Sequence, residues 1–290
     1  MAKFHDRLLQ PGALVADGAT GTMIQKAGLP RGTAPERWNL ENQEAVRALH
    51  QGYFEAGADI VLTNTFGGTR IRLEKDQLGE RAEEINRVAA QLARQVAGQD
   101  RLVFGDIGPI GKLLKPYGPL LYNDAAAAFA EQAKGLSEGG ADAILVETMA
   151  DLNEVKAAVE GVRKVCDLPL LVTMSFDSHG CTMMGVKPAD AIRELLALKV
   201  DVGGANCGRT LTETLSAIQA MRQAAPETTL MAKPNAGLPH ISGNDTVFDV
   251  TPETMAEYAL KFRDAGVKIF GGCCGSTPEH IRAVANALHS

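Results

Sequence analysis

Short apolar runs alternate with longer amphipathic stretches from one end of this chain to the other, and this alternation constrains the fold more than any other feature. The eight apolar runs are candidate strands at residues 13–16, 60–65, 102–107, 143–148, 170–176, 202–206, 229–234 and 268–272. The eight amphipathic stretches are candidate helices at residues 44–56, 81–96, 123–138, 152–165, 188–198, 211–224, 252–265 and 278–288. Strands that alternate with helices build a parallel sheet, and eight such units with no linker between them favour a closed barrel. The pattern therefore predicts an α/β protein of one domain, a (β/α)8 TIM barrel over residues 1–290.

Residues at the predicted helix ends carry the expected capping chemistry. Asp151 and Glu154 form a capping-box-like pair, and Thr251 and Thr277 each precede a proline that can take the first helical position. No Gly-x-Gly-x-x-Gly motif follows the first strand, which argues against an open dinucleotide-binding sheet. Glycines that can end a helix in the left-handed conformation occur in the segments 55–59, 138–142 and 264–266.

Charge and hydropathy exclude several classes of partner. The net charge of −6 and the pI near 5.6 leave no basic footprint for nucleic acid or for an anionic membrane. The apolar runs are far too short to span a bilayer, and residues 1–6 lack the apolar core of a secretory signal. We therefore expect a cytoplasmic protein that binds neither nucleic acid nor membrane. In a reducing compartment, clustered cysteines bind metal or take part in catalysis more often than they form disulfides.

Every predicted strand ends in polar or thiol side chains. Barrel enzymes place their catalytic groups at the carboxyl ends of the strands and in the loops that follow. Buried parallel strands otherwise consist of aliphatic residues, so this placement indicates one site at the barrel mouth. The residues concerned are Asp17, Asn64, Thr65, Asp106, Glu147, Ser175, Asp177, Asn206, Cys207, Lys233, Asn235, Cys273 and Cys274.

Three of the five cysteines follow two of these strands. A lone free cysteine is most often a small buried hydrophobic residue, which is our interpretation of Cys166, and we do not expect Cys181 to be a metal ligand either. Three thiolates from two strand ends instead suit Zn²⁺ with one ligand position left open, and a set of sulfur ligands favours a sulfur substrate. We predict that Cys207, Cys273 and Cys274 bind zinc.

Two carboxylates at strand ends suggest how the rest of a substrate is held. Taken alone, Asp17 and Glu147 could be ordinary loop or capping residues. Together in one barrel mouth they suit a substrate ammonium group, through charge-assisted hydrogen bonds. The backbone N–H groups at Gly18, Ala19 and Thr20 could receive a carboxylate, because small side chains leave them accessible. These groups predict a pocket for an amino acid.

Other polar residues near the mouth allow more than one interpretation. Asn235 could form a turn, or its carboxamide oxygen could occupy the fourth zinc position before substrate binds, and we include it in the predicted substrate site. Asp106, Lys112 and the segment 117–122 could line the approach of a partner or lie in solvent, so the role of the 112–122 loop stays open.

The motifs together resemble the homocysteine S-methyltransferase family. The resemblance covers nearly the whole chain, the two cysteine motifs are highly specific, and the chain is most similar to the homocysteine-binding barrel module of cobalamin-dependent methionine synthase. The motifs are Asp17-Gly18-Ala19-Thr20-Gly21-Thr22, Thr63-Asn64-Thr65-Phe66-Gly67-Gly68, Gly105-Asp106-Ile107-Gly108-Pro109, Glu147-Thr148, Asn206-Cys207, Pro234-Asn235-Ala236-Gly237-Leu238-Pro239 and Gly271-Gly272-Cys273-Cys274-Gly275.

The resemblance implies a zinc-dependent enzyme that binds homocysteine as a zinc thiolate and methylates it to methionine. By resemblance, the three clustered cysteines are the zinc ligands and the catalytic residues. Asp17 and Glu147 hold the substrate amino group, and the backbone of Gly18 and Ala19 holds its carboxylate.

This chain differs from known members of the family in two ways that bear on the methyl donor. Members that use betaine have tyrosines where this chain has Gly67 and Thr148, and a quaternary ammonium donor needs an aromatic cage. No cobalamin module fits in 290 residues. We therefore expect methylcobalamin on a partner domain or a corrinoid-binding protein, with S-methylmethionine or another small donor as the alternative.

Two rival functions belong to other classes. The chain could be a non-catalytic barrel that binds zinc and a thiol amino acid. It could also be an aldolase that uses Lys233 as a Schiff base, because this is the only lysine predicted at a strand end.

Overall fold

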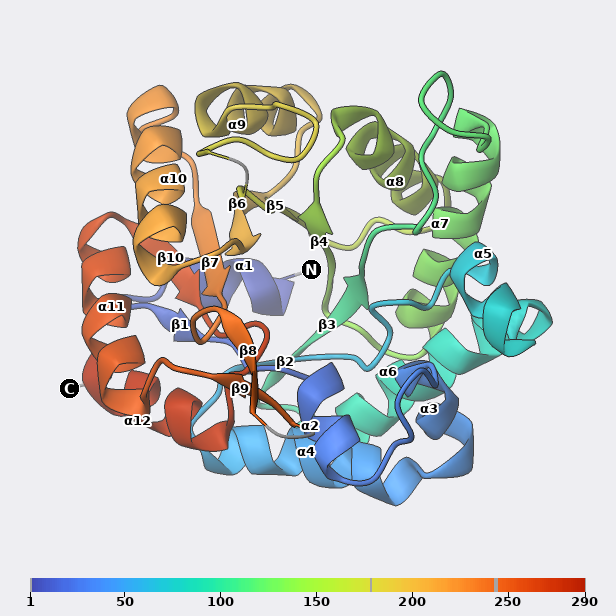
Figure 1. Ribbon diagram of the computed structural model, residues 1–290, viewed down its shortest axis with the longest axis horizontal. Helices are drawn as coiled ribbons and strands as arrows, with labels where there is room; N and C mark the ends of the chain where they lie inside the picture. The colour runs from blue at the N-terminus through green and yellow to red at the C-terminus, as the bar shows by residue number, and fades with distance from the viewer. Residues whose placement is uncertain (1, 178, 243–244, 290) are drawn as a thin grey trace.

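Eight parallel strands form a barrel with helices around it in the computed structural model, which describes residues 2–177, 179–242 and 245–289 (Figure 1). The sheet order is β1-β10-β7-β6-β5-β4-β3-β2. A parallel bridge between Ala16 and Ile60 joins the first and last strands of this order and closes the barrel. The barrel strands are β1 (Leu14–Val15), β2 (Ile60–Leu62), β3 (Leu102–Ile107), β4 (Ala143–Met149), β5 (Leu170–Met174), β6 (Val202–Cys207), β7 (Leu230–Pro234) and β10 (Val267–Phe270).

The helices follow the strands as predicted, and the (β/α)8 barrel prediction is confirmed. Three predicted helices have the observed bounds, and the others differ by one residue at one or both ends. None of the described helices is both long and apolar enough to cross a membrane. The α-helices are α1 (Ala2–Leu9), α2 (Gly21–Lys26), α3 (Trp38–Glu41), α4 (Gln43–Glu55), α5 (Arg70–Leu73), α6 (Ala82–Ala97), α7 (Tyr122–Glu138), α8 (Leu152–Val165), α9 (Pro188–Ala197), α10 (Leu211–Ala224), α11 (Pro252–Asp264) and α12 (Pro278–Leu288).

The apolar core has two main layers, because alternate residues of each strand face opposite sides. Leu62, Phe104 and Leu145 belong to a cluster of side chains from the barrel interior. A larger cluster packs the outer faces of the strands against the helices and includes Val103, Val146 and Phe129. Burial on both faces explains why the strands consist of continuous apolar runs.

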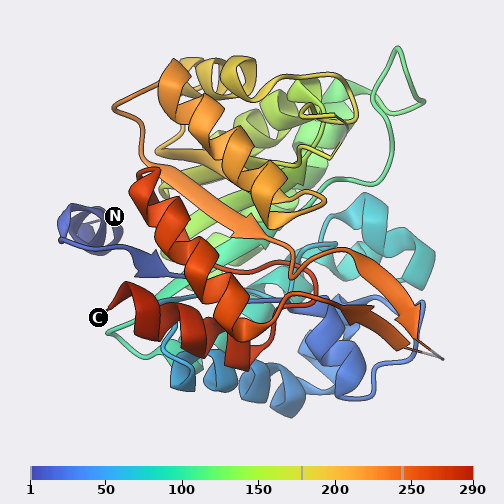
Figure 2. The same ribbon diagram turned by 60° about the vertical axis from the view of Figure 1, so that its left-hand side comes forward.

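Helices α1, α2, α3 and α5 and one hairpin were not predicted from the sequence, and α1 and the hairpin lie at opposite ends of the barrel (Figure 2). Helix α1 lies beyond the end of the barrel where the strands begin (Figure 2), and its Phe4 ring packs edge-on against Phe104 at 5.4 Å. An antiparallel hairpin of β8 (Pro239–Ser242) and β9 (Asp245–Phe248) follows β7 at the opposite end (Figure 2). Both are short, so neither carries a long periodic pattern.

One capping prediction was wrong in part. The Asp151 side chain accepts a hydrogen bond from Asn153 N–H and caps α8 as expected. The Glu154 carboxylate does not return to the Asp151 backbone, because its Oε1 accepts a hydrogen bond from Ile110 N–H at 2.7 Å. The reciprocal capping box occurs instead at α12, between Thr277 and His280.

Candidate active site

A cavity of about 390 Å³ opens at the carboxyl ends of the barrel strands. The segments after β1, β2 and β10 and the C-terminal parts of strands β3, β4, β6 and β7 contribute its walls, so residues far apart in the sequence meet there. The residues predicted at the barrel mouth that line it are Gly18, Ala19, Thr20, Asn64, Thr65, Asp106, Glu147, Cys207, Lys233, Cys273 and Cys274.

The three predicted zinc ligands lie together in this cavity. The Sγ atoms of Cys207, Cys273 and Cys274 all lie within 4.8 Å of one another, and those of Cys207 and Cys273 are 3.1 Å apart. Three soft sulfur donors at this spacing, with the cavity on the remaining side, fit a tetrahedral zinc site with an open position. Cys207 adopts a left-handed backbone with φ 56°, which turns the end of β6 at the cluster.

The thiols of this cluster differ in pKa. Hydrogen bonds with Cys273 and Cys274 raise the pKa of Cys207, whereas hydrogen bonds from Cys207 and Cys273 lower the pKa of Cys274. A thiolate on Cys274 is therefore stabilised by its two neighbours. Binding of a divalent cation would displace their protons, because thiolates are the metal-binding form.

A buried lysine lies between the two carboxylates predicted to hold the substrate amino group. Lys233 Nζ lies 3.5 Å from Asp17 Oδ1 and 3.6 Å from Glu147 Oε2, and all three side chains are buried. Burial favours the neutral amine, but the charges of Glu147 and Asp17 outweigh it and raise the pKa of Lys233. Lys233 is therefore a counter-ion of this site, and its protonated amine is a poor nucleophile.

The carboxylates of Asp17, Glu147 and Asp106 differ in how many hydrogen bonds they accept from the protein. Asp17 Oδ2 accepts a hydrogen bond from Leu62 N–H at 2.7 Å, and Asp17 does not line the cavity itself. Glu147 Oε2 and Asp106 Oδ1 are buried without a hydrogen-bond partner in the described part of the chain. Burial raises the pKa of Asp17 to about 6 and that of Glu147 to about 7, and it raises the pKa of Asp106 well above the usual range. A substrate cation would relieve this cost.

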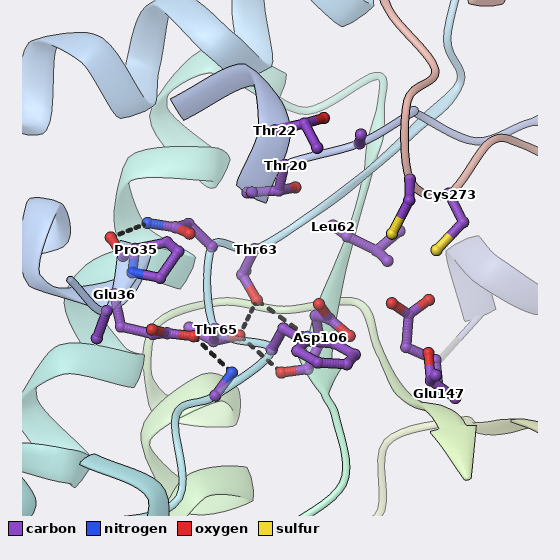
Figure 3. A pocket seen from close by; sticks show the side chains of 18 of the residues that line it. Thr20, Thr22, Pro35, Glu36, Leu62, Thr63, Thr65, Asp106, Glu147 and Cys273 are labelled. Carbon is purple, nitrogen blue, oxygen red and sulfur yellow. Dashed lines mark hydrogen bonds between the residues drawn. The ribbon is translucent and has the colours of Figure 1, made fainter. Parts of the chain in front are cut away.

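Asp106, whose role the sequence left open, belongs to this group. Figure 3 shows its side chain and that of Glu147 extending towards the Cys273 thiol. Its main chain is held by hydrogen bonds: Asp106 N–H donates to Thr63 Oγ1 at 3.0 Å, and Asp106 O accepts from Thr65 Oγ1 at 2.7 Å. Lys112 is half exposed and does not line the cavity, so the structure separates the two residues.

The backbone predicted to hold a carboxylate is anchored from behind. Tyr53 Oη donates to Ala19 O at 2.8 Å, and Ala19 N–H donates to Ser276 Oγ at 3.2 Å. A Cβ added to Gly18 would lie 2.8 Å from Ser276 Oγ, so the close packing here requires glycine. Gly18 and Ala19 therefore line the cavity as predicted, with one N–H already in contact with Ser276.

Both polar atoms of the Asn235 side chain form hydrogen bonds with the main chain. Its Nδ2 donates to Gly208 O at 2.8 Å, and its Oδ1 accepts from Cys274 N–H at 3.1 Å. Asn235 thus links the turns that carry two of the clustered cysteines, and it does not line the cavity. Its role as a zinc or substrate ligand stays a prediction.

Sequence reasoning missed Glu36 and Arg72, which also line the cavity. The Glu36 carboxylate accepts a hydrogen bond from Gly67 N–H, and Arg72 stacks over Phe66 at 5.1 Å. It also missed Gln132, whose Nε2 donates to Thr65 O at 2.7 Å. Gln132 is a fully buried amide within an apolar helix face, and that pattern is the signal that could have revealed it.

Comparisons with known proteins agree with the geometry. The family model described as homocysteine S-methyltransferase matches residues 14–288. The chain is 34% identical to the methionine synthases of Mycobacterium leprae and Mycobacterium tuberculosis, over 95% and 97% of its own length. It covers only 24% and 25% of those proteins, so it spans about a quarter of their length.

The same fold occurs in a solved structure. The metallated form of the homocysteine methyltransferase MmuM from Escherichia coli superposes with a TM-score of 0.83, over 98% of this chain and 99% of that one. The two are 22% identical, so this likeness concerns the fold alone. The family-model match covers nearly all of the sequence, and on that ground the chain belongs to the homocysteine S-methyltransferase family.

Proposed function

We propose that this chain is a zinc-dependent enzyme that methylates the sulfur of homocysteine to give methionine. The observation that carries the proposal is the presence of three clustered thiols and two partly unsatisfied carboxylates in one cavity. A thiol that binds a metal and an ammonium that binds carboxylates are the two ends of an amino-thiol substrate. Family membership supports homocysteine as that substrate.

Each group of residues has a distinct task. Cys207, Cys273 and Cys274 would hold zinc, which when bound lowers the pKa of a substrate thiol and keeps its sulfur nucleophilic. Glu147 would bind the substrate ammonium, with Asp17 behind Lys233 and Asp106 completing the negative surroundings. The backbone at Gly18 and Ala19 would hold the substrate carboxylate. These contacts orient the sulfur for in-line attack on a methyl group without a general base.

Methylcobalamin, presented by a partner domain or a corrinoid-binding protein, is the donor that we propose. The relatives named methionine synthase are about four times as long as this chain, which leaves room for further domains in them. Phe66 is the sole aromatic residue among the described residues that line the cavity, so a cage for betaine has little support. We place the reaction in the cytoplasm, because a cluster of free thiols suits a reducing compartment.

Methyl transfer by the purified zinc-loaded chain tests the proposal. Incubation with homocysteine and methylcobalamin should produce methionine, detected by mass spectrometry, and a chain stripped of zinc should produce none. Zinc-dependent binding of homocysteine without methionine from any donor would favour the non-catalytic rival. Borohydride trapping of a carbonyl compound on Lys233 would favour the aldolase rival.

A further inference from the structure

The side chain of Asn206 joins three strands at the edge of the candidate site. Asn206 lies in β6 and is almost completely buried. Its Oδ1 accepts hydrogen bonds from Thr173 Oγ1 in β5 at 2.7 Å and from Thr148 N–H in β4 at 2.8 Å. Its Nδ2 donates to Thr148 Oγ1 at 2.6 Å. This one amide therefore ties strands β4 and β6, which are not neighbours in the sheet.

The segment that Asn206 holds has an unusual backbone. Thr148 has φ 63°, a left-handed conformation that β-branched residues rarely adopt. The pairing of β4 with β5 shifts between Val146 and Met149, with one extra residue on β4. Such a bulge re-aims a side chain, and here the residue that it turns is Glu147, directly before Thr148. The strained backbone and the two hydrogen bonds to Thr148 occur at the same residue.

The two residues joined by these hydrogen bonds, Thr148 and Asn206, are next to the two residues proposed to bind the amino group and the thiol of the substrate. Thr148 directly follows Glu147, and Asn206 directly precedes Cys207, whose own φ is 56°. Both Glu147 and Cys207 line the cavity, one as a carboxylate and the other as a thiol. A substrate of fixed length that binds both ends requires a fixed separation between them.

We propose that Asn206 is a positioning residue that fixes the separation between the Glu147 carboxylate and the Cys207 thiol. The amide holds Thr148 in the left-handed conformation and thereby sets the direction of Glu147. Without it, the backbone at Thr148 relaxes towards an extended conformation and Glu147 turns away from the thiol cluster. This inference rests on the proposed function, because it assumes a substrate with both an ammonium and a thiol.

Direct binding of two thiols to the zinc-loaded protein tests this role by calorimetry. Homocysteine carries the amino group, whereas 4-mercaptobutanoate has the same thiol and carboxylate without it. Asn206→Ala should weaken homocysteine binding about tenfold and change 4-mercaptobutanoate binding by less than about twofold. The zinc content should stay near that of the parent. A merely structural role would weaken both ligands equally.

A second substitution that removes the backbone strain at residue 148 should restore homocysteine binding. Glycine adopts a positive φ without a penalty, so Asn206→Ala combined with Thr148→Gly should recover much of the lost homocysteine affinity. Unchanged homocysteine binding by Asn206→Ala, equal losses for both thiols, or no rescue would overturn the inference. If Asn206→Ala does not fold, Asn206→Leu carries the same comparison, because it keeps the side-chain volume and cannot hydrogen-bond to Thr148. A parent protein that fails to bind homocysteine would instead refute the proposed function.

Discussion

At the residue scale, each clustered cysteine is held by its own backbone contacts. Cys273 N–H donates to Pro234 O at 2.9 Å, and Cys274 N–H donates to the Asn235 side chain at 3.1 Å. The Cys207 carbonyl accepts a hydrogen bond from Thr214 Oγ1 at 3.2 Å. These contacts hold the main chain at all three cysteines, which reduces the entropy cost of forming the site.

Replacement of single cysteines tests the metal assignment. Cys207→Ser, Cys273→Ser and Cys274→Ser should each lower the zinc content from about one ion per chain to well below it, because a zinc site with three protein ligands loses one. Cys166→Ser should keep its zinc, since Cys166 lies at the end of α8 and hydrogen-bonds to Val162 O. Elemental analysis after dialysis measures the difference. Equal zinc retention in all four variants would contradict the assignment.

Removal of one carboxylate tests the substrate contacts. Glu147→Gln should raise the KM for homocysteine by about tenfold or more, because a charge-assisted hydrogen bond contributes ~1.5–3 kcal/mol. Its zinc content should not change. Glu154→Gln is the matched control, since Glu154 is a buried carboxylate that does not line the cavity. If Glu147→Gln retains the parent's KM, Glu147 is not a substrate ligand.

A buried histidine predicts how acid affects stability. His50 in α4 is fully buried, both ring nitrogens lack a hydrogen-bond partner among the described residues, and burial lowers its pKa from 6.5 to about 4. The unfolded chain therefore binds this proton more readily than the folded chain, so stability is lost as the pH falls from 6.5 towards 4. His50→Leu should remove roughly 1–2 kcal/mol of this loss at pH 5.

Urea unfolding of the metal-free protein measures this effect, since zinc release would otherwise add its own pH dependence. The difference in stability between His50→Leu and the parent should be larger in favour of the variant at pH 5 than at pH 7.5. An identical difference at both values would show that His50 does not titrate in this range.

At the element scale, the close approach of β6 and β7 depends on one glycine. Gly204 pairs with Met231, and a Cβ added to Gly204 would lie 1.9 Å from the Met231 carbonyl oxygen. The clash is with the backbone of the next strand, so neither strand can relieve it by rotating a side chain. These two strands carry Cys207 and Asn235 at their ends, and their spacing therefore sets part of the site.

A pair of glycine variants tests this packing. Gly204→Ala should destabilise the protein by about 3 kcal/mol or more, at the upper end of overpacking effects. Gly52→Ala should instead stabilise it by about 0.5–1 kcal/mol, because Gly52 lies inside α4 and an added Cβ would meet its nearest atom only at 3.9 Å. Thermal unfolding compares the two. A Gly204→Ala variant as stable as Gly52→Ala would contradict the packing argument.

At the scale of the whole molecule, the cavity lies at the carboxyl ends of the barrel strands. The long loops after β1, β2, β3 and β7 gather at that end of the barrel (Figure 2). We expect methyl transfer from free methylcobalamin to be slow and to become faster when a corrinoid-binding protein presents the cofactor. Betaine should give no methionine above background. Comparison of initial rates with each donor measures this. Efficient turnover with betaine, or with S-methylmethionine alone, would contradict the proposed donor.

The sequence was enough to predict the eight barrel strands, their order along the chain and the end of the barrel that carries the site. Apolar runs of strand length alternating with helical stretches allow few other arrangements, and the C-terminal ends of parallel strands must meet. The sequence also predicted that Cys207, Cys273 and Cys274 lie close together, because Cys207 ends β6 and the other two follow shortly after β10. Residues that follow a strand are placed by the barrel itself.

Which polar groups contact one another inside the mouth could not be predicted from the sequence and became clear from the folded structure. Several of these contacts join separate strands or loops. They are the ion pairs of Lys233 with Asp17 and Glu147, and the hydrogen bonds of Glu154 with Ile110 and of Asn206 with Thr148. Such contacts depend on side-chain direction and on a one-residue shift in strand pairing, which no periodic pattern records. Helix α1 depends likewise on the packing of Phe4 against Phe104, since eight residues form a stable helix in water only when tertiary contacts support them.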